Sequence, residues 1–228
     1  MGDFKAYSSV DYAYETIKGW ILSGYLTPGS KLDQDGAAEK MQISRTPIRH
    51  ALERLDAEGL VINTPHRGAV VTPISEEDLN NVYDIRAQLE AMALIQAMPH
   101  ITETSIVNLR AVLATQKAVG DPNINIVMEQ NRSFHRSIVV LCDNHALISI
   151  IDGIWEQCER YRRIYYQVPG SNERIIREHS QLVELIAAGK TQDASDFLIE
   201  HTRQSQRRLL AYFSKDIAPL MFKPLILD

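Results

Sequence analysis

Three histidines in the second half of the chain have the spacing of a possible metal site. His135 follows Asn131 by four positions in EQNRSFHRSIVVLCDN, so both side chains project from one face of a predicted helix. His179 and His201 lie on two later predicted helices. Three imidazoles on three antiparallel helices can converge on one interior point, and three such nitrogens plus an oxygen suit a divalent transition metal. Taken singly, each histidine is more often a surface or hydrogen-bonded core residue, so spacing alone leaves both interpretations open.

A polar cluster near the N-terminus has the chemistry needed to contact DNA. Ser44, Arg45, Thr46 and Arg49 stand at the start of a predicted helix, and the two arginines share its exposed face because they are four residues apart. Hydrogen-bond donors in this position reach phosphates and guanine edges when the helix enters the major groove. On an arbitrary helix, two exposed arginines are more often merely solvated.

Local sequence signals predict the elements that would position this cluster. Helical periodicity covers residues 9–24, 33–41 and 44–58, with Asp33 and Ser44 as N-caps and Pro47 in the first turn of the third helix. Two β-branched runs, 60–62 and 69–72, flank a turn and read as a two-stranded wing. The wing tip would reach the adjacent minor groove.

The rest of the chain reads as helix only. From Ser75 to Lys215 the pattern predicts about six helices, separated by Pro, Gly and Asn/Asp breakers. We therefore expect a mainly α protein with two domains, a winged helix-turn-helix at 1–74 and an all-α antiparallel bundle at 75–228.

Composition and charge limit the kind of protein that this chain can be. The chain has 228 residues, 45% of them hydrophobic, and a net charge of -5, so no global positive field attracts nucleic acid. Residues 1–72 hold eight basic and nine acidic side chains. Cys142 and Cys158 show no disulfide framework, and neither a signal peptide nor a membrane-spanning run is evident. We expect a soluble cytoplasmic protein whose DNA contact is local.

The N-terminal strings resemble a known family. GYLTPGSKL, SRTPIRHALERLDAEGL and a wing ending HRGAVV are similar to the GntR family of bacterial regulators over roughly the first seventy residues. The resemblance implies these contacts with operator DNA: Ser44, Arg45, Thr46 and Arg49 on the recognition helix, and His66, Arg67 and Gly68 at the wing tip.

One segment departs from the family pattern. The family usually has Leu-Ser-Glu-Arg-Glu-Leu-Ala before the turn, where this chain has LDQDGAA from Leu32 to Ala38. Asp35 replaces the basic residue and should repel phosphate. Gly36 and Ala37 are expected to weaken the helix and its packing.

The histidine pattern resembles the FCD effector domain of FadR-type GntR regulators, from about Ser75 to Lys215. In metal-containing members an Asp and three His bind the ion, and the resemblance implies the matching set Asn131, His135, His179 and His201. The metal would be Zn, Ni or Mn. A neutral amide at Asn131 is a weaker ligand than a carboxylate, which predicts an ion that is weakly held or bridged to Asn131 by water.

Arg86, in VYDIRAQLEAMA, matches the RxxLE motif that opens this effector domain. Its guanidinium would clamp the carboxylate of a small organic acid. An Arg86–Glu90 ion pair on a solvated helix face is the equally weighted alternative. Six helices are nearer to the shorter, vanillate-responsive (VanR-like) subgroup.

These features together predict a homodimeric transcriptional regulator on a palindromic operator, commonly a repressor, that senses a small carboxylate at a metal site. A metal-responsive regulator is an alternative. A metal-dependent hydrolase, with Glu90 or Glu178 as base, is a remote one, because no nucleophile elbow, phosphate-binding loop or HExxH helix is present.

Overall fold

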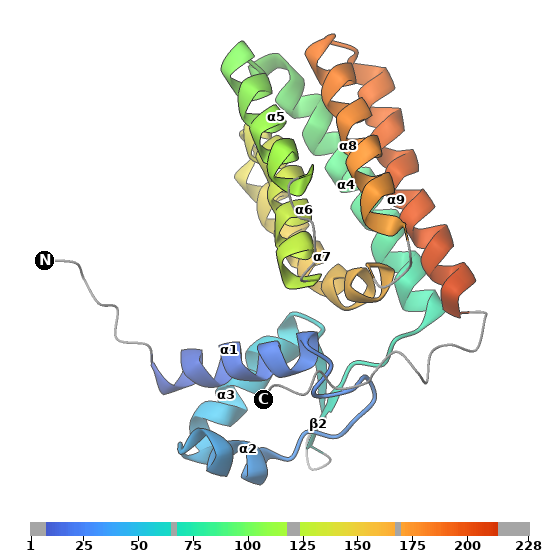
Figure 1. Cartoon of the computed structure of the whole chain (residues 1–228). Coiled ribbons are helices and arrows are strands. Elements are labelled where there is room, and N and C mark those ends of the chain that lie inside the picture. Colours follow the sequence, from blue (N-terminus) through green and yellow to red (C-terminus); the bar gives the residue numbers. More distant parts are fainter. Residues whose placement is uncertain (1–7, 65–67, 118–123, 167–169, 214–228) are drawn as a thin grey trace, which may run out of the picture. The chain divides into compact units, whose positions relative to one another are not determined.

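The computed structural model describes residues 8–64, 68–117, 124–166 and 170–213, and the chain forms two compact units that divide between Ser75 and Glu76. Figure 1 shows the two units and labels their elements.

The N-terminal unit is a three-helix domain with a wing. Its helices are α1 (Ser9–Leu22), α2 (Gln34–Met41) and α3 (Arg45–Ala57). Asp33 caps α2 by accepting a hydrogen bond from the Asp35 amide at 3.1 Å, as its sequence position predicts. The predicted apolar stripe of α3 is fully buried and packs into one core with α1, α2 and both strands; it comprises Ile48, Ala51, Leu52 and Leu55.

Two antiparallel strands form the wing. β1 (Val61–Thr64) pairs with β2 (Gly68–Val71) in a register that sets Val61 opposite Val71 and Thr64 opposite Gly68. The segment before α2 lies along the open edge of β2, because Leu32 donates its backbone hydrogen bond to Ala69. The strands fall within a residue or two of the predicted runs. His66 and Arg67 lie outside the described residues.

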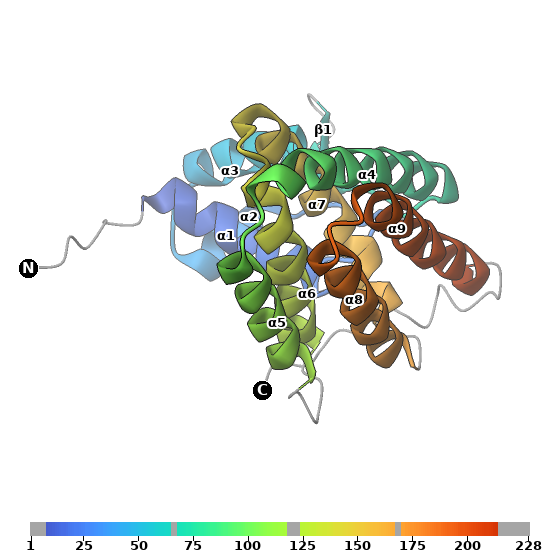
Figure 2. The same cartoon turned by 90° about the horizontal axis from the view of Figure 1, so that it is seen from above.

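The second unit is an antiparallel helical bundle. Its elements are α4 (Glu76–Ala97), η1 (Met98–His100), α5 (Glu103–Lys117), α6 (Ile124–Val139), η2 (Val140–Cys142), α7 (His145–Tyr165), α8 (Ser171–Ala187) and α9 (Thr191–Phe213). Helix α4 packs against α9 and α7, and α5 against α6 and α8. Figure 2 shows α8 and α9 side by side in the same bundle. Within the described ranges the six predicted helices of this unit are confirmed.

Two apolar clusters hold the bundle together. One joins α4, α5, α6, α8 and α9 around residues such as Leu94, Phe134 and Leu198, and the other joins α4 and α7 around Trp155. Both cysteines are free and buried. Of the helices in the described ranges, none is apolar over enough of its length to cross a bilayer.

One sequence expectation about α2 is wrong in part. The segment forms a regular helix, and Ala37 and Ala38 are buried in the core of the N-terminal unit. Gly36 also has a structural reason, since a Cβ at this position would lie 2.6 Å from Oδ2 of the capping Asp33. The small side chains therefore fit the packing of α2, and the expected loss of helix stability stays a prediction.

Candidate metal centre, effector cavity and DNA-binding surface

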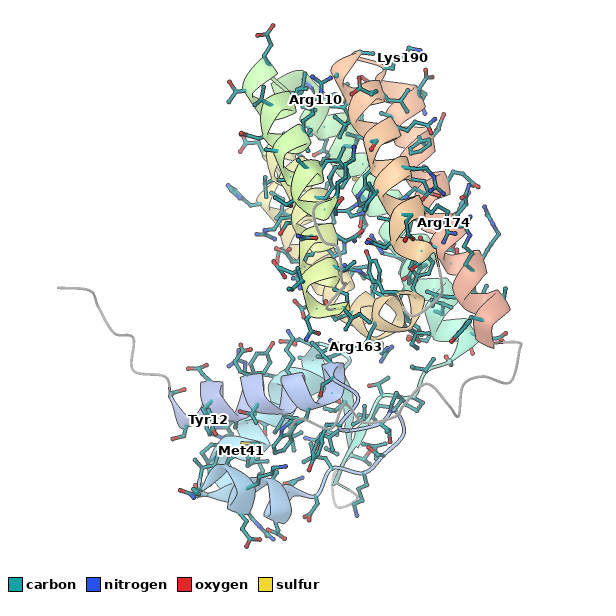
Figure 3. All side chains as sticks on the ribbon, viewed as in Figure 1. Tyr12, Met41, Arg110, Arg163, Arg174 and Lys190 are labelled. Carbon is teal, nitrogen blue, oxygen red and sulfur yellow. The ribbon has the colours of Figure 1, made fainter. Side chains whose placement is uncertain are left out.

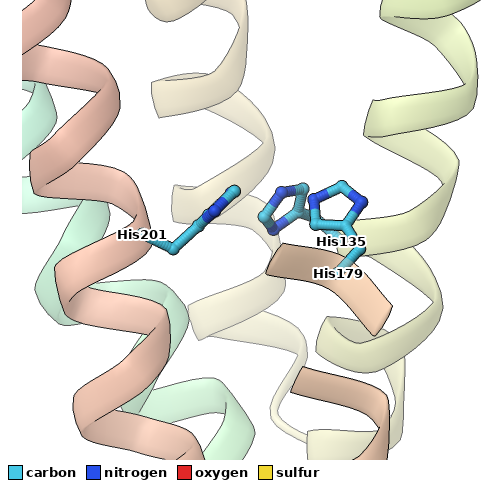
Figure 4. Close-up of side chains that lie close together, drawn as sticks. All are labelled: His135, His179 and His201. Atoms are coloured by element: carbon cyan, nitrogen blue, oxygen red, sulfur yellow. The ribbon is translucent and has the colours of Figure 1, made fainter. Parts of the chain in front are cut away.

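Three histidines from three helices meet inside the bundle. His135 on α6, His179 on α8 and His201 on α9 place one ring nitrogen each within 4.8 Å of one another, and all three side chains are buried. Figure 4 shows the three rings turned toward a common point. The convergence that sequence spacing left open is thus a property of the folded bundle.

In each ring, the Nδ1 atom lies close to an oxygen acceptor, within hydrogen-bond geometry for His179 and His201 and at ion-pair distance for His135. Nδ1 of His135 lies 2.9 Å from Oε2 of Glu90. Nδ1 of His179 lies 2.9 Å from Oε1 of Gln116, and Nδ1 of His201 lies 2.6 Å from Oε2 of Glu178. An acceptor at Nδ1 favours the tautomer with the proton there and the lone pair on Nε2.

The opposite nitrogens are the atoms that could bind a cation. Nε2 of His135 and Nε2 of His179 are buried and have no hydrogen-bond partner among the described residues. A buried polar atom without a partner is costly, so two such atoms in one histidine cluster call for a specific explanation. Three histidine nitrogens that share one point fit the donor set of a divalent transition metal.

The electrostatics keep two of these rings neutral. Burial lowers the pKa of His135 to about 4, although Glu90 opposes the shift. Burial also lowers the pKa of His179 well below its usual value, and any charge on His135 or His201 lowers it further. Neutral imidazole is the form that binds metal ions, so near neutral pH a cation would not have to displace a proton from His135 or His179.

Glu90 ties the histidine cluster to Arg86. Its Oε1 accepts hydrogen bonds from Nε of Arg86 at 2.7 Å and from Nε1 of Trp155 at 2.5 Å. Burial would raise the pKa of the Glu90 carboxyl, but the Arg86 guanidinium and His135 hold that pKa well below its usual range. The Arg86–Glu90 ion pair of the alternative interpretation is formed, but it is buried, with 5% and 1% exposure, and not on a solvated face.

A small polar cavity adjoins the cluster. Its volume is about 20 Å³, which suits one water-sized group. The lining comprises Tyr83, Arg86, Asn131, His135, Arg162, Tyr165, Tyr166, Ile175, His201, Thr202 and Ser205. The predicted residues Asn131, His135, His201 and Arg86 therefore share one cavity.

Two further groups of the cavity suit an anion. The Arg162 side chain is buried and donates from Nη2 to the Met128 carbonyl at 2.8 Å, and within the described ranges no carboxylate forms an ion pair with it. The Thr202 hydroxyl is buried, with no hydrogen-bond partner among the described residues. Arg162 and Thr202 thus add a cation and a hydroxyl that the Arg86 prediction did not include.

The Glu178 carboxylate connects His201 to the start of α8. Arg174, labelled in Figure 3, places its Nε 3.7 Å from Oε1 of Glu178 and donates to the Tyr165 hydroxyl at 2.6 Å. Sequence reasoning missed the pairing of Glu178 with His201, because Glu178 is adjacent to His179 in the chain but faces the next helix. It also missed Gln116, for which the sequence offers no signal.

The predicted DNA-contacting residues gather on the N-terminal unit. Ser44, Arg45, Thr46 and Arg49 are exposed at the start of α3, and the Ser44 side chain makes no capping hydrogen bond. A hollow of about 640 Å³ beside them is lined by residues of α2, α3 and the wing, among them Gln34, Arg49 and Gly68. Gly68 opens β2 with φ of +86°, a conformation that L side chains rarely adopt. The described members of the set thus share one surface.

Comparisons with known proteins agree with both units. The family described as "Bacterial regulatory proteins, gntR family" matches residues 10–71, and the FCD domain family matches residues 81–204. The Nta operon transcriptional regulator of Aminobacter aminovorans is 27% identical over 189 residues, covering 83% of this chain and 89% of that protein. The transcriptional repressor GlaR of Escherichia coli is 26% identical over 197 residues, covering 82% and 90%. These relatives are regulators, not enzymes.

Solved structures show the same fold. McbR/YncC of E. coli superposes with a TM-score of 0.75 at 23% identity, over 90% of this chain and 99% of that one. A putative GntR regulator from Rhodococcus sp. RHA1 superposes with a TM-score of 0.72 at 17% identity, over 89% and 97%.

Proposed function

The chain belongs to the GntR family of bacterial transcriptional regulators and carries an FCD domain, and from this premise we propose that it is a repressor released from operator DNA by a small organic acid bound at a metal site. The observation that carries the metal proposal is the set of three buried histidines that each place one ring nitrogen within 4.8 Å of the others, while each Nδ1 atom lies close to an oxygen acceptor. A repressor of this kind would act in the cytoplasm, where it meets operator DNA.

His135, His179 and His201 would hold the ion, and Asn131 would offer an oxygen from one helical turn before His135. The ion is Zn, Ni or Mn in this proposal, since three imidazoles accept each of them. When bound, it supplies a Lewis acid that attracts carboxylate oxygen. The protein's own part is to orient the rings through Glu90, Gln116 and Glu178.

The effector would be a small carboxylate held beside the metal. Arg86 and Arg162 place two guanidinium groups at the cavity, and Glu90 neutralises only Arg86. Because the cavity holds about one water-sized group, an organic acid requires lining side chains to move. Such movement gives the acid different affinities for two arrangements of the helices, which is the condition for it to change operator affinity.

The regulator would act as a homodimer on two half-sites of a palindrome. Exposed apolar side chains recur along one face of α4, at Ile85, Met92 and Ile95, and α7 adds Ile150. A face of this kind on a helix of the FCD domain suits burial against a second copy.

A metal-responsive regulator is the second candidate. Asn131 favours it, because a neutral amide holds a cation less tightly than a carboxylate and leaves the ion more readily exchanged. In that case chelation alone would change operator affinity without any organic acid. If the ion is instead part of an effector site, chelation removes the response to the acid.

Elemental analysis by plasma mass spectrometry tests the metal proposal. We expect near-stoichiometric Zn, Ni or Mn in the protein purified without chelators and its loss in His135→Ala. The exposed His145→Ala is the matched control and should retain the ion. Equal metal in His135→Ala and His145→Ala would reject the site, and absence of metal from the wild type would mean that Asn131 has cost the site its ion.

DNA binding is tested by selecting duplexes from a random library with the full-length protein. Arg49→Ala is expected not to bind the selected duplex. Arg110→Ala, which removes the same charge from an exposed position in the FCD domain, should bind it as the wild type does. Unchanged binding by Arg49→Ala would remove that residue from the recognition set.

A further inference from the structure

An ion pair connects the two helices of the helix-turn-helix. Arg45, the first residue of α3, pairs through Nη2 with Oδ1 of Asp35 in the first turn of α2. Both side chains remain largely exposed, at 64% for Arg45 and 62% for Asp35. The carboxylate therefore holds a guanidinium on the surface that carries the predicted DNA contacts.

The helices do not need this ion pair for their packing. Ala37, Ala38 and Met41 of α2 are buried in the same apolar core as the inner face of α3. Asp33 caps α2 independently, and Gly36 leaves room for that cap. An exposed ion pair contributes little to stability in water, so the pair is better explained by what it does to Arg45.

We propose that Asp35 is a specificity-determining residue, which positions the Arg45 guanidinium for a base edge and restrains it from non-specific contact with phosphate. This inference rests on the proposed binding of DNA by α3. A guanidinium has five N–H donors, so one carboxylate leaves donors free for the two acceptors of guanine. The same carboxylate offsets the charge that attracts Arg45 to any phosphate, whatever the sequence.

The neighbouring arginine provides the contrast within the same helix. Arg49 lies one turn after Arg45, is also exposed, and lines the hollow beside the wing. Within the described ranges Arg49 forms no ion pair with an acidic residue. Asp35 therefore acts on one of the two arginines, which lets a substitution at position 35 change Arg45 alone.

The experiment measures the DNA affinity of the full-length wild type and of Asp35→Asn by fluorescence anisotropy across a salt series. Two duplexes of equal length are compared, the one selected by the wild type and one of mixed sequence. Asp35→Asn is expected to bind the mixed-sequence duplex about tenfold more tightly at low salt. The slope of log K for this variant, plotted against log salt concentration, should steepen by about one per protomer, because the Arg45 guanidinium becomes free to contact phosphate. The preference for the selected duplex should fall about fivefold or more.

Two variants serve as controls. Glu39→Gln removes an equal charge from an exposed position one turn later on α2 and should leave the preference and the salt slope near the wild-type values. Asp35→Glu keeps the charge and should retain most of the preference. The midpoint of thermal melting should be the same for the wild type, Asp35→Asn and the two control variants.

Asp35→Asn matching Glu39→Gln in slope and preference would overturn the inference while leaving DNA binding by α3 intact. Weaker binding of Asp35→Asn to both duplexes, with a lowered melting midpoint, would also overturn it, because the carboxylate would then be structural. Failure of the wild type to bind either duplex overturns this inference together with the proposed function.

Discussion

Replacing Glu90 with glutamine is expected to destabilise the FCD domain and weaken metal binding together. One Glu90 oxygen accepts from Arg86 and Trp155, and the other lies 2.9 Å from Nδ1 of His135. Glutamine keeps a single acceptor oxygen and places an NH₂ group against one of these donors. The Arg86 charge loses its counterion. If the NH₂ group faces His135, that ring can accept from it only with its own proton on Nε2, the tautomer in which Nε2 cannot bind a metal.

The size of the effect follows from burial. Arg86 is 5% exposed and Glu90 1%, so water cannot replace the lost carboxylate. Breaking a buried ion pair by removing one partner costs about 3–5 kcal/mol. The free energy of unfolding of a native protein is about 5–15 kcal/mol, so this loss is a large fraction of it. Removal of a residue that orients a ligating histidine lowers metal affinity by about 10- to 100-fold.

Urea unfolding of the metal-free protein and zinc titration by calorimetry measure the two effects. Glu184→Gln, which breaks the exposed Arg110–Glu184 pair, is the matched control and should be close to the wild type in both. A loss below about 1 kcal/mol in Glu90→Gln would refute the argument that Glu90 is the counterion of a buried charge.

A double variant keeps the test valid if Glu90→Gln does not fold. Arg86→Met with Glu90→Gln removes both charges, and burial of an uncharged pair is often no worse than burial of the ion pair. We expect it to regain part of the stability. Zinc affinity should stay low, because His135 still lacks its carboxylate.

Three further outcomes are expected. The free energy of unfolding of the metal-free protein should fall as pH falls from about 6.5 toward 4, because burial lowers the pKa of His135 to about 4 and the unfolded chain therefore binds more protons in this window. Urea unfolding at about pH 5.5 should show a loss of about 1 kcal/mol from this group, and His135→Gln should not show it. Asp33→Ala should cost about 1 kcal/mol as a lost N-cap of α2, measured by thermal melting; no loss would mean that the cap is redundant. Met92→Asp should shift the protein from dimer to monomer in sedimentation while the exposed Arg110→Ala does not, and an unshifted Met92→Asp would exclude the α4 face as the dimer contact.

Much of the N-terminal unit could be predicted from the sequence because its signals are local. Asp33 stands at the start of a periodic segment and caps it, and Ile48, Leu52 and Leu55 recur at helical spacing and are buried. Caps and periodicity act over a few residues, so they can be recognised in the sequence without knowledge of the rest of the fold. The same local signals did not show that Ala37 packs in the core or that Gly36 leaves room for the Asp33 cap, because both depend on neighbours that helix propensity does not describe.

Part of the histidine cluster could likewise be predicted from the sequence, and part depends on the tertiary structure. The sequence by itself determined that Asn131 and His135 share a helix face and that His179 and His201 lie on other helices. Only the tertiary structure decided that the rings meet and that Glu90, Gln116 and Glu178 face their Nδ1 atoms. It also decided that the Arg86–Glu90 pair is buried and that Asp35 reaches Arg45. Glu90, Gln116 and Glu178 each come from a different helix than the histidine that they face. Which side chains meet, and which of them are buried, is fixed by how the helices pack, a property that no local periodicity contains.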